Sequence, residues 1–248
     1  NTNGYYFKRG FTMEYKYGKK ANYEDFSSGR VLYHISGMTN FPVRLAQEIY
    51  GRCLEYSPKK RDICLYDCCC GGGYLLTVLG FLNQDTIECI IGSDINEDLL
   101  NIARRNLSLL SKEGMNDRIK ELEGLIEKYK KESHIEAKNS ALKLKNMIKK
   151  NIEFEVFYSD VLKKIEQKIK PDIVITDLPY GQKVDWIGEG ENFVDKLLDS
   201  LYDICHQDTI ICLCMDKKQK VNNKKFIRIE KHKVGKRKLE ILRIGSEK

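Results

Sequence analysis

The 248-residue sequence has no long apolar run, and this absence excludes one class of protein. No stretch approaches the roughly 18 uninterrupted apolar residues that indicate a transmembrane helix. No secretory signal is visible either. We therefore expect a soluble, cytoplasmic protein that does not span a membrane.

The sequence also lacks the ligand spacing of a metal site. It has nine cysteines but only four histidines, and their spacing matches no zinc-finger pattern. Cys68, Cys69 and Cys70 are consecutive, so their side chains could not easily all pair. The following cysteines lie in apolar runs, where a thiol behaves as a small hydrophobic group: Cys64, Cys89, Cys205, Cys212 and Cys214. We expect reduced thiols, as in the cytoplasm, and no bound metal.

Positive charge is scarce in the central segments of the chain. Residues 63–110 carry 2 Lys/Arg against 6 Asp/Glu, and residues 151–215 carry 6 against 13. Basic residues dominate elsewhere, with 11 against 6 in 1–62, 11 against 7 in 111–150 and 13 against 4 in 216–248. A basic periphery around an acidic centre suits a polyanion such as nucleic acid, although solubility alone would also account for it.

Short apolar runs alternate with helical patterns through most of the chain. The predicted strands are 63–66, 89–93, 154–158, 172–176 and 209–215, and the predicted helices are 41–50, 74–82, 99–110 and 194–205. Asn40 is a candidate cap for the first helix, with Pro42 in its first turn. Runs at 226–230 and 239–244 predict a hairpin around Gly235. The pattern indicates an α/β fold with a seven-stranded, mostly parallel sheet and an antiparallel terminal hairpin.

Two segments stand outside this alternation. Residues 1–62 are predicted to form a basic N-terminal extension and a helix, and residues 63–248 the main domain. Residues 111–150 contain no proline and are dense in Lys and Glu, which predicts a helical insertion between the second and third strands. The insertion is either a solvated helical pair or an RNA contact. A monomer is favoured, with the oligomeric state left open.

A glycine cluster follows the first predicted strand, but it lacks the G-x-G-x-x-G spacing of dinucleotide oxidoreductases. It reads Asp67-Cys-Cys-Cys-Gly71-Gly-Gly73 and precedes a helix. Glycines at this place let the backbone pass close beneath a ligand. An acid followed by three glycines suits a cofactor with an ammonium and a sulfonium group better than a pyrophosphate. A plain strand-to-helix turn would also use these residues.

Acidic residues end the next two strands. Asp94 could accept hydrogen bonds from both ribose hydroxyls of an adenosine. Asp160 could accept from the adenine amine while the Val161 N–H meets a ring nitrogen. Capping of the following helix is the alternative role for both acids.

The fourth strand ends in Asp177-Leu178-Pro179-Tyr180. Asp177 and the Leu178 carbonyl could accept hydrogen bonds from the amine of a base. Pro179 would stiffen the turn, and Tyr180 could stack on the flipped base. The chain has no Pro-Cys motif, which argues against cytosine-C5 methylation because that chemistry needs a thiol nucleophile.

Together these motifs resemble the Rossmann-like S-adenosylmethionine methyltransferases that methylate amino groups. Their fourth motif is usually Asn/Asp-Pro-Pro-Tyr/Phe, and Leu178 replaces its first proline. The resemblance implies S-adenosylmethionine as cofactor and Asp177, Leu178, Pro179 and Tyr180 as catalytic residues. It implies the following cofactor-binding residues: Asp67, Cys69, Gly71, Gly73, Asp94, Ile95, Asp160, Val161 and Arg44. For Arg44, a contact with RNA phosphate or a surface ion pair is the alternative.

Longer stretches are similar to the AviRa family of ribosomal RNA guanine methyltransferases, which is associated with avilamycin resistance. The stretches are 41–46, 69–80 and 176–181 with Trp186, and the resemblance runs from about Val31 to Ile244. Cys68 and Gly72 stand where that family would have proline and serine, and neither change removes a group that the cofactor needs. The resemblance implies methylation of a guanine in large-subunit (23S) rRNA and resistance to orthosomycin antibiotics.

Two other functions remain open at the level of sequence. DNA adenine-N6 methylation uses the same acceptor geometry, and a non-catalytic RNA-binding protein could keep the same fold. The Asp-Leu-Pro-Tyr-Gly form resembles that of guanine-N2 RNA methyltransferases, but the sequence does not choose between guanine N2 and N1.

Overall fold

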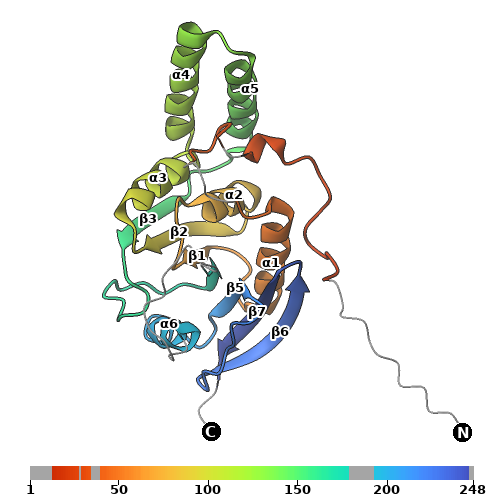
Figure 1. Ribbon diagram of the computed structural model, residues 1–248, viewed down its shortest axis with the longest axis vertical. Coiled ribbons are helices and arrows are strands. Elements are labelled where there is room, and N and C mark those ends of the chain that lie inside the picture. Colours follow the sequence, from red (N-terminus) through yellow and green to blue (C-terminus); the bar gives the residue numbers. More distant parts are fainter. Residues whose placement is uncertain (1–12, 28, 35–39, 179–192, 246–248) are drawn as a thin grey trace, which may run out of the picture.

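The structure is a computed structural model that describes residues 13–27, 29–34, 40–178 and 193–245 (Figure 1). Pro179, Tyr180 and Trp186, which the sequence places in or near the catalytic motif, lie outside the described residues.

Seven strands in the described part of the chain form one sheet in the order β3-β2-β1-β4-β5-β7-β6. Their bounds are β1 Ile63–Asp67, β2 Ile87–Asp94, β3 Glu153–Tyr158, β4 Ile173–Asp177, β5 Ile210–Asp216, β6 Phe226–Val234 and β7 Arg237–Ile244. Strands β1 to β5 pair in parallel, whereas β7 pairs antiparallel with β5 and β6. The predicted fold, a mostly parallel sheet with an antiparallel terminal hairpin, is confirmed.

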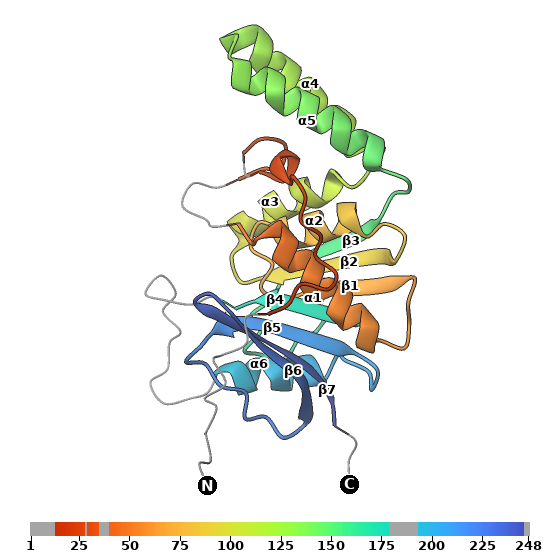
Figure 2. The same ribbon diagram turned by 90° about the vertical axis from the view of Figure 1, so that its right-hand side faces the viewer.

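Helices cover both faces of the sheet, as a mostly parallel sheet requires (Figures 1 and 2). Along β4, Ile173 and Ile175 point into one core, and Val174 points into the other. The first core lies under α1 (Val43–Tyr56), α2 (Tyr74–Leu82) and α3 (Glu97–Ser108). The second lies under α6 (Phe193–Tyr202) and apolar side chains of the loop 159–172.

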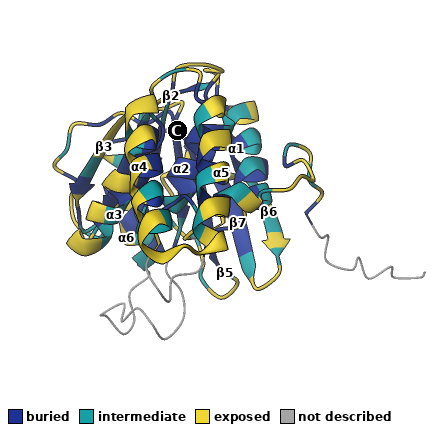
Figure 3. Cartoon of the chain, turned by 90° about the horizontal axis from the view of Figure 1, so that it is seen from above, coloured by how far each residue is buried: buried dark blue, intermediate teal, exposed yellow. Residues whose placement is uncertain are grey.

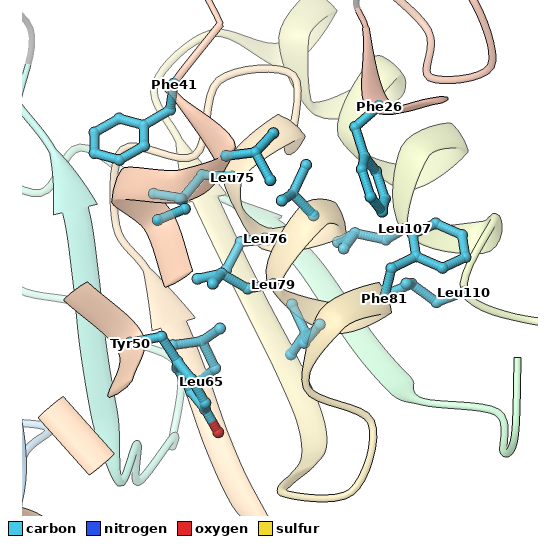
Figure 4. Close-up of a cluster of buried hydrophobic side chains, with 14 of the residues drawn as sticks. Phe26, Phe41, Tyr50, Leu65, Leu75, Leu76, Leu79, Phe81, Leu107 and Leu110 are labelled. Atoms are coloured by element: carbon cyan, nitrogen blue, oxygen red, sulfur yellow. The ribbon is translucent and has the colours of Figure 1, made fainter. Parts of the chain in front are cut away.

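The segment before α1 belongs to the first core. Phe26, on the short 3-10 helix η1 (Glu24–Phe26), packs against Phe81 of α2 with ring centroids 5.8 Å apart (Figure 4). Its carbonyl accepts a hydrogen bond from the Tyr74 hydroxyl. Leu32 is fully buried in the same cluster. The described residues 13–27 and 29–34 therefore share their core with the sheet.

The predicted helical insertion is confirmed as a pair of helices between α3 and β3. Helix α4 (Lys112–Tyr129) and helix α5 (Glu132–Met147) pack side by side (Figure 3) and project beyond the sheet (Figures 1 and 2). Their facing sides are apolar, with Leu122 and Ala141 buried. The Arg118 side chain fastens α4 to the N-terminal segment by donating to the Val31 carbonyl.

Two helix starts differ from the sequence-based expectation. Helix α1 begins at Val43 with Pro42 in the N-cap position, so Asn40 is not its cap. Helix α3 begins at Glu97, and the Asn96 side chain caps it by accepting from the N–H groups of Asp98 and Leu99. Proline fits a helix start because it has no N–H to satisfy.

All nine cysteines carry free thiols. Among the described helices, none has the length and apolar character needed to cross a bilayer.

Candidate active site

The described residues form a pocket at the carboxyl ends of β1 and β4. These strands are neighbours, and β2 lies on the other side of β1, so the chain order reverses at this point. Ligands of open parallel sheets bind at such a switch point. Four predicted residues line the pocket: Asp67, Cys69, Gly71 and Asp177.

The glycine loop turns sharply from β1 into α2. Gly71 and Gly73 have φ angles of 51° and 73°, which residues with side chains rarely adopt. A Cβ on Gly73 would lie 3.0 Å from the Cα of Ala103 on α3. The Gly73 N–H donates to the Cys70 carbonyl at 2.8 Å, closing the turn. The loop therefore needs glycine both for its conformation and for the close approach of α3.

Asp94 supports the glycine loop from the end of β2. Its Oδ2 accepts from the Gly71 N–H at 2.8 Å, and its Oδ1 accepts from the Asn96 N–H at 3.0 Å. Helix capping was the alternative role for Asp94, but the residue that caps α3 is Asn96. A carboxylate offers about four acceptor sites, so two remain for the hydroxyls of a ligand.

Asp67 is a nearly buried acid at the base of the pocket, with 2% of its surface exposed. Its Oδ1 accepts from the Cys69 N–H at 3.0 Å. The pKa of Asp67 is raised to about 7, mainly by burial; the Thr176 side chain and the hydrogen bond from the Cys69 N–H oppose the rise, and the charges of Asp94 and Asp177 add to it. Such a carboxyl is stabilised in its ionised form by a cation, which is what a ligand with an ammonium or sulfonium group would bring.

Asp177 ends β4 and is held on one side only. Its Oδ2 lies 3.1 Å from Nη1 of Arg237, at the start of β7. Its Oδ1 is buried and has no hydrogen-bond partner among the described residues. Burial raises the pKa of Asp177 to about 6, while the Arg237 charge opposes that rise. Arg237 itself lies over the Phe41 ring, with 5.3 Å to the centroid.

Leu178 continues the line of β4 beyond Asp177. Its N–H donates to the Cys214 carbonyl of β5 at 2.8 Å, and its side chain is fully buried in the second core. This anchoring fixes the direction of the backbone immediately after the acid.

Several predicted site residues are not among those that line the pocket. Ile95 is 59% exposed, and Val161 is buried in the second core. Asp160 accepts from the Leu162 N–H and pairs with Lys163, in a turn rather than at a helix start. Arg44 donates to the Gly18 carbonyl and lies over the Tyr15 ring, where the N-terminal segment crosses α1.

Sequence reasoning missed residues that reach the pocket from distant segments, among them Tyr33 and Asn106. Asn106, buried on α3, donates from Nδ2 to the carbonyls of Gly72 at 2.8 Å and Tyr33 at 3.0 Å. Its Oδ1 accepts from the Tyr33 N–H at 2.7 Å. The sequence signal that could have revealed Asn106 is its position as a polar residue beside the apolar face of the predicted helix 99–110.

Comparison with known proteins identifies the family of this chain. A sequence model of the family described as rRNA methyltransferase AviRa matches residues 13–237. The 23S rRNA (guanine(2535)-N(1))-methyltransferase of Streptomyces viridochromogenes is 33% identical over 234 residues, which are 91% of this chain and 93% of that protein. Two solved structures of the rRNA methyltransferase AviRa from the same organism have TM-scores of 0.83 and 0.84 at 32% identity, covering 93% of this chain and 96% of theirs. The chain thus belongs to the AviRa family of rRNA methyltransferases.

Proposed function

We propose that the protein transfers a methyl group from S-adenosylmethionine to N1 of a guanine in 23S rRNA. The observation that carries the proposal is the buried Oδ1 of Asp177, an acceptor without a partner among the described residues, in a side chain that lines the pocket. The Streptomyces relative, whose name specifies guanine N1, supports the choice of atom. Membership of an rRNA methyltransferase family speaks against the DNA and the non-catalytic alternatives.

The glycine loop and the acids beside it are the proposed cofactor site. Bound there, S-adenosylmethionine would supply an electrophilic methyl group whose leaving group is a neutral thioether. Asp94 offers its remaining acceptor sites to the ribose hydroxyls. Asp67 offers a carboxylate to the positive end of the cofactor, and Gly71 allows close approach of the backbone. The family resemblance also implies cofactor-binding roles for Cys69, Gly73, Ile95, Asp160 and Val161, whereas the Arg44 guanidinium is engaged by Gly18 and Tyr15.

Asp177 is the proposed proton acceptor. The neutral guanine ring carries a proton on N1, and this proton must leave as the new N–C bond forms. Oδ1 of Asp177 accepts it, and the raised pKa makes this carboxylate a stronger base than an exposed aspartate. Arg237 holds Oδ2, so it orients the carboxylate and keeps it ionised near neutral pH.

The residues after Asp177 complete the proposed base site. The Leu178 carbonyl is the second acceptor, for the 2-amino group beside N1. Pro179 stiffens the turn, and Tyr180 stacks on the ring of the flipped guanine, as the motif predicts. The burial of Leu178 against β5 supports this role because it limits backbone movement at the site.

The test combines methyl transfer with mapping of the product. Wild-type protein, labelled S-adenosylmethionine and 23S rRNA from a strain without the gene should give one methylated guanine. N1-methylguanine cannot form a Watson–Crick pair, so reverse transcription should stop at that position. Labelling without a stop, with N2-methylguanine identified by mass, would overturn the N1 assignment. No transfer to free 23S rRNA or to large ribosomal subunits would overturn the proposal itself.

We also propose that the methylation confers resistance to orthosomycin antibiotics and takes place in the cytoplasm, where the ribosomes are. Expression in an avilamycin-sensitive bacterium should raise the inhibitory concentration of avilamycin. The Asp177→Asn protein, expressed at the same level, is the control and should leave the host sensitive. Equal resistance from both proteins would contradict a role for methylation.

A further inference from the structure

The turn between α4 and α5 carries a compact group of basic and aromatic residues. We name residues 128–131, Lys-Tyr-Lys-Lys, the hairpin tip. The tip lies at the outer end of the helical pair (Figures 1 and 2). All four residues are exposed, and Tyr129 has 48% of its surface accessible. Lys130 ends α4 in a left-handed conformation, which turns the chain abruptly toward α5.

Two lysine ammonium groups lie near the Tyr129 ring. Nζ of Lys128 is 5.1 Å from the ring centroid, and Nζ of Lys131 is 5.9 Å from it. The His134 ring lies 6.0 Å away, tilted by 49°. A ring with ammonium groups beside it matches the chemistry of an unpaired base and its phosphates.

The topology places the tip on the same side of the molecule as the pocket. Helix α3 follows β2 and runs back toward the amino ends of the strands, so α4, which reverses direction again, runs toward the carboxyl ends. Figures 2 and 3 both show the tip on that side. Eighteen residues of α4 span roughly 27 Å at about 1.5 Å per residue. A large substrate at the pocket can therefore also reach the tip.

We propose that the hairpin tip is a second contact surface for the RNA substrate, remote from the methyl-transfer pocket. Tyr129 stacks on an unpaired base, and Lys128, Lys130 and Lys131 contact the flanking phosphates. The identity of the partner as rRNA rests on the proposed function. The tip makes the contact that holds a large substrate while one guanine enters the pocket.

The test separates RNA binding from catalysis with exposed, matched substitutions. The variants are Tyr129→Ala, Tyr129→Phe and the triple Lys128→Ala/Lys130→Ala/Lys131→Ala. The charge-matched control is Lys112→Ala/Lys168→Ala/Lys170→Ala, three exposed lysines at the start of α4 and before β4, on the opposite side. Each protein is assayed for KM and kcat with 23S rRNA, for Kd with the same RNA at several salt concentrations, and for thermal unfolding.

Tyr129→Ala should raise KM and Kd for the RNA about 5- to 50-fold, while kcat at saturating RNA stays near wild type. Tyr129→Phe should behave as wild type because it keeps the ring. The triple lysine variant should reduce the slope of log Kd against log salt by about 2, for three phosphate contacts to single-stranded RNA. The control triple should change neither quantity, and all variants should unfold at the wild-type temperature.

Three outcomes decide against the proposal or separate it from the proposed function. Unchanged KM and salt slope in the tip variants would overturn it. Loss of activity on assembled subunits alone, with naked 23S rRNA methylated normally, would also overturn it and identify a ribosomal protein as the partner of the tip. If the wild-type protein methylates no rRNA, the proposed function fails, and the RNA-binding measurement alone then decides for or against the tip.

Discussion

The two strand ends that form the pocket differ in how well their polar groups are satisfied. After β1, the glycine loop closes on itself, and Asp94 accepts hydrogen bonds from the N–H groups of Gly71 and Asn96. After β4, Asp177 has Arg237 on one oxygen and no described partner on the other. The first region is organised before any ligand arrives, and the second has an acceptor that no described residue satisfies.

This difference indicates that the ends of β1 and β4 have different roles in the reaction. A preorganised loop lowers the cost of holding a cofactor in one place. An unmet carboxylate oxygen in a buried site is unfavourable for the free protein, but it is available to the substrate. Substitutions in the loop should therefore act on cofactor binding and stability, and substitutions at the end of β4 should act on the chemical step.

Asp177→Asn should produce the largest effect. The amide cannot accept the guanine N1 proton, so kcat should fall about 100- to 10,000-fold. Cofactor affinity, measured by calorimetry, should stay within about threefold of wild type because the glycine loop is untouched. Full activity in this variant would remove Asp177 from the proposed mechanism.

Asp67→Asn should give the opposite pattern. Loss of the carboxylate should raise the Kd of S-adenosylmethionine about 10- to 100-fold, since hydrogen bonds to charged groups are worth about 1.5–3 kcal/mol. At saturating cofactor, kcat should remain within a few fold of wild type. A normal Kd with a collapsed kcat would reverse the comparison and place the chemistry at the end of β1.

Gly73→Ala tests whether the loop is organised by its backbone. The residue has a φ of 73°, and the added Cβ would meet the Ala103 backbone at 3.0 Å, so the free energy of unfolding should fall by about 1–3 kcal/mol. Gly124→Ala is the matched control: its Cβ would meet nothing within 4 Å inside α4, and it should gain about 0.5–1 kcal/mol. Urea denaturation measures both, and equal changes would contradict the argument.

The pH dependence of kcat/KM for the RNA should report the pair at the end of β4. The mechanism needs ionised Asp177, whose pKa is raised to about 6, so kcat/KM should be half-lost near pH 6 and fall further in more acidic solution. Arg237 lowers that pKa. Arg237→Gln should therefore shift the acid limb upward, by up to about one pH unit, and Arg237→Lys should restore it partly. If the acid limb lies at the same pH in wild type and in the Arg237 variants, the titrating group is not Asp177.

The sequence was sufficient to predict those candidate-site residues that directly follow a strand. Asp67 and Asp177 each end an apolar run, and the carboxyl ends of parallel strands lie at one edge of a sheet, so the pattern placed both acids at that edge; that their strands are neighbours is a finding of the structure. Contacts between distant segments were not readable. Asn106 binds Tyr33 from 73 residues away, and nothing in either local sequence indicates the other.

Arg44 is a second residue whose contacts with a distant segment could not be predicted from the sequence. The family resemblance suggested a contact with cofactor carboxylate or RNA phosphate, with a surface ion pair as the alternative, but in the structure its guanidinium contacts Gly18 and Tyr15. The N-terminal segment has weak periodicity, so its path across α1 could not be predicted. That path depends on buried contacts such as the hydrogen bonds from the Tyr17 and Gly18 N–H groups to Glu48.

The amino-acid sequence by itself determined the order of strands and helices, the helical insertion and the acids at the strand ends, because apolar periodicity and glycine act over a few residues. Only the tertiary structure decided which charges meet and how far they are buried. Strand β5 pairs with β4 on one side and with antiparallel β7 on the other, which brings Arg237 to Asp177. Burial at this place raises the pKa of Asp177. Burial and charge pairing arise from packing across the chain, so no local pattern encodes them.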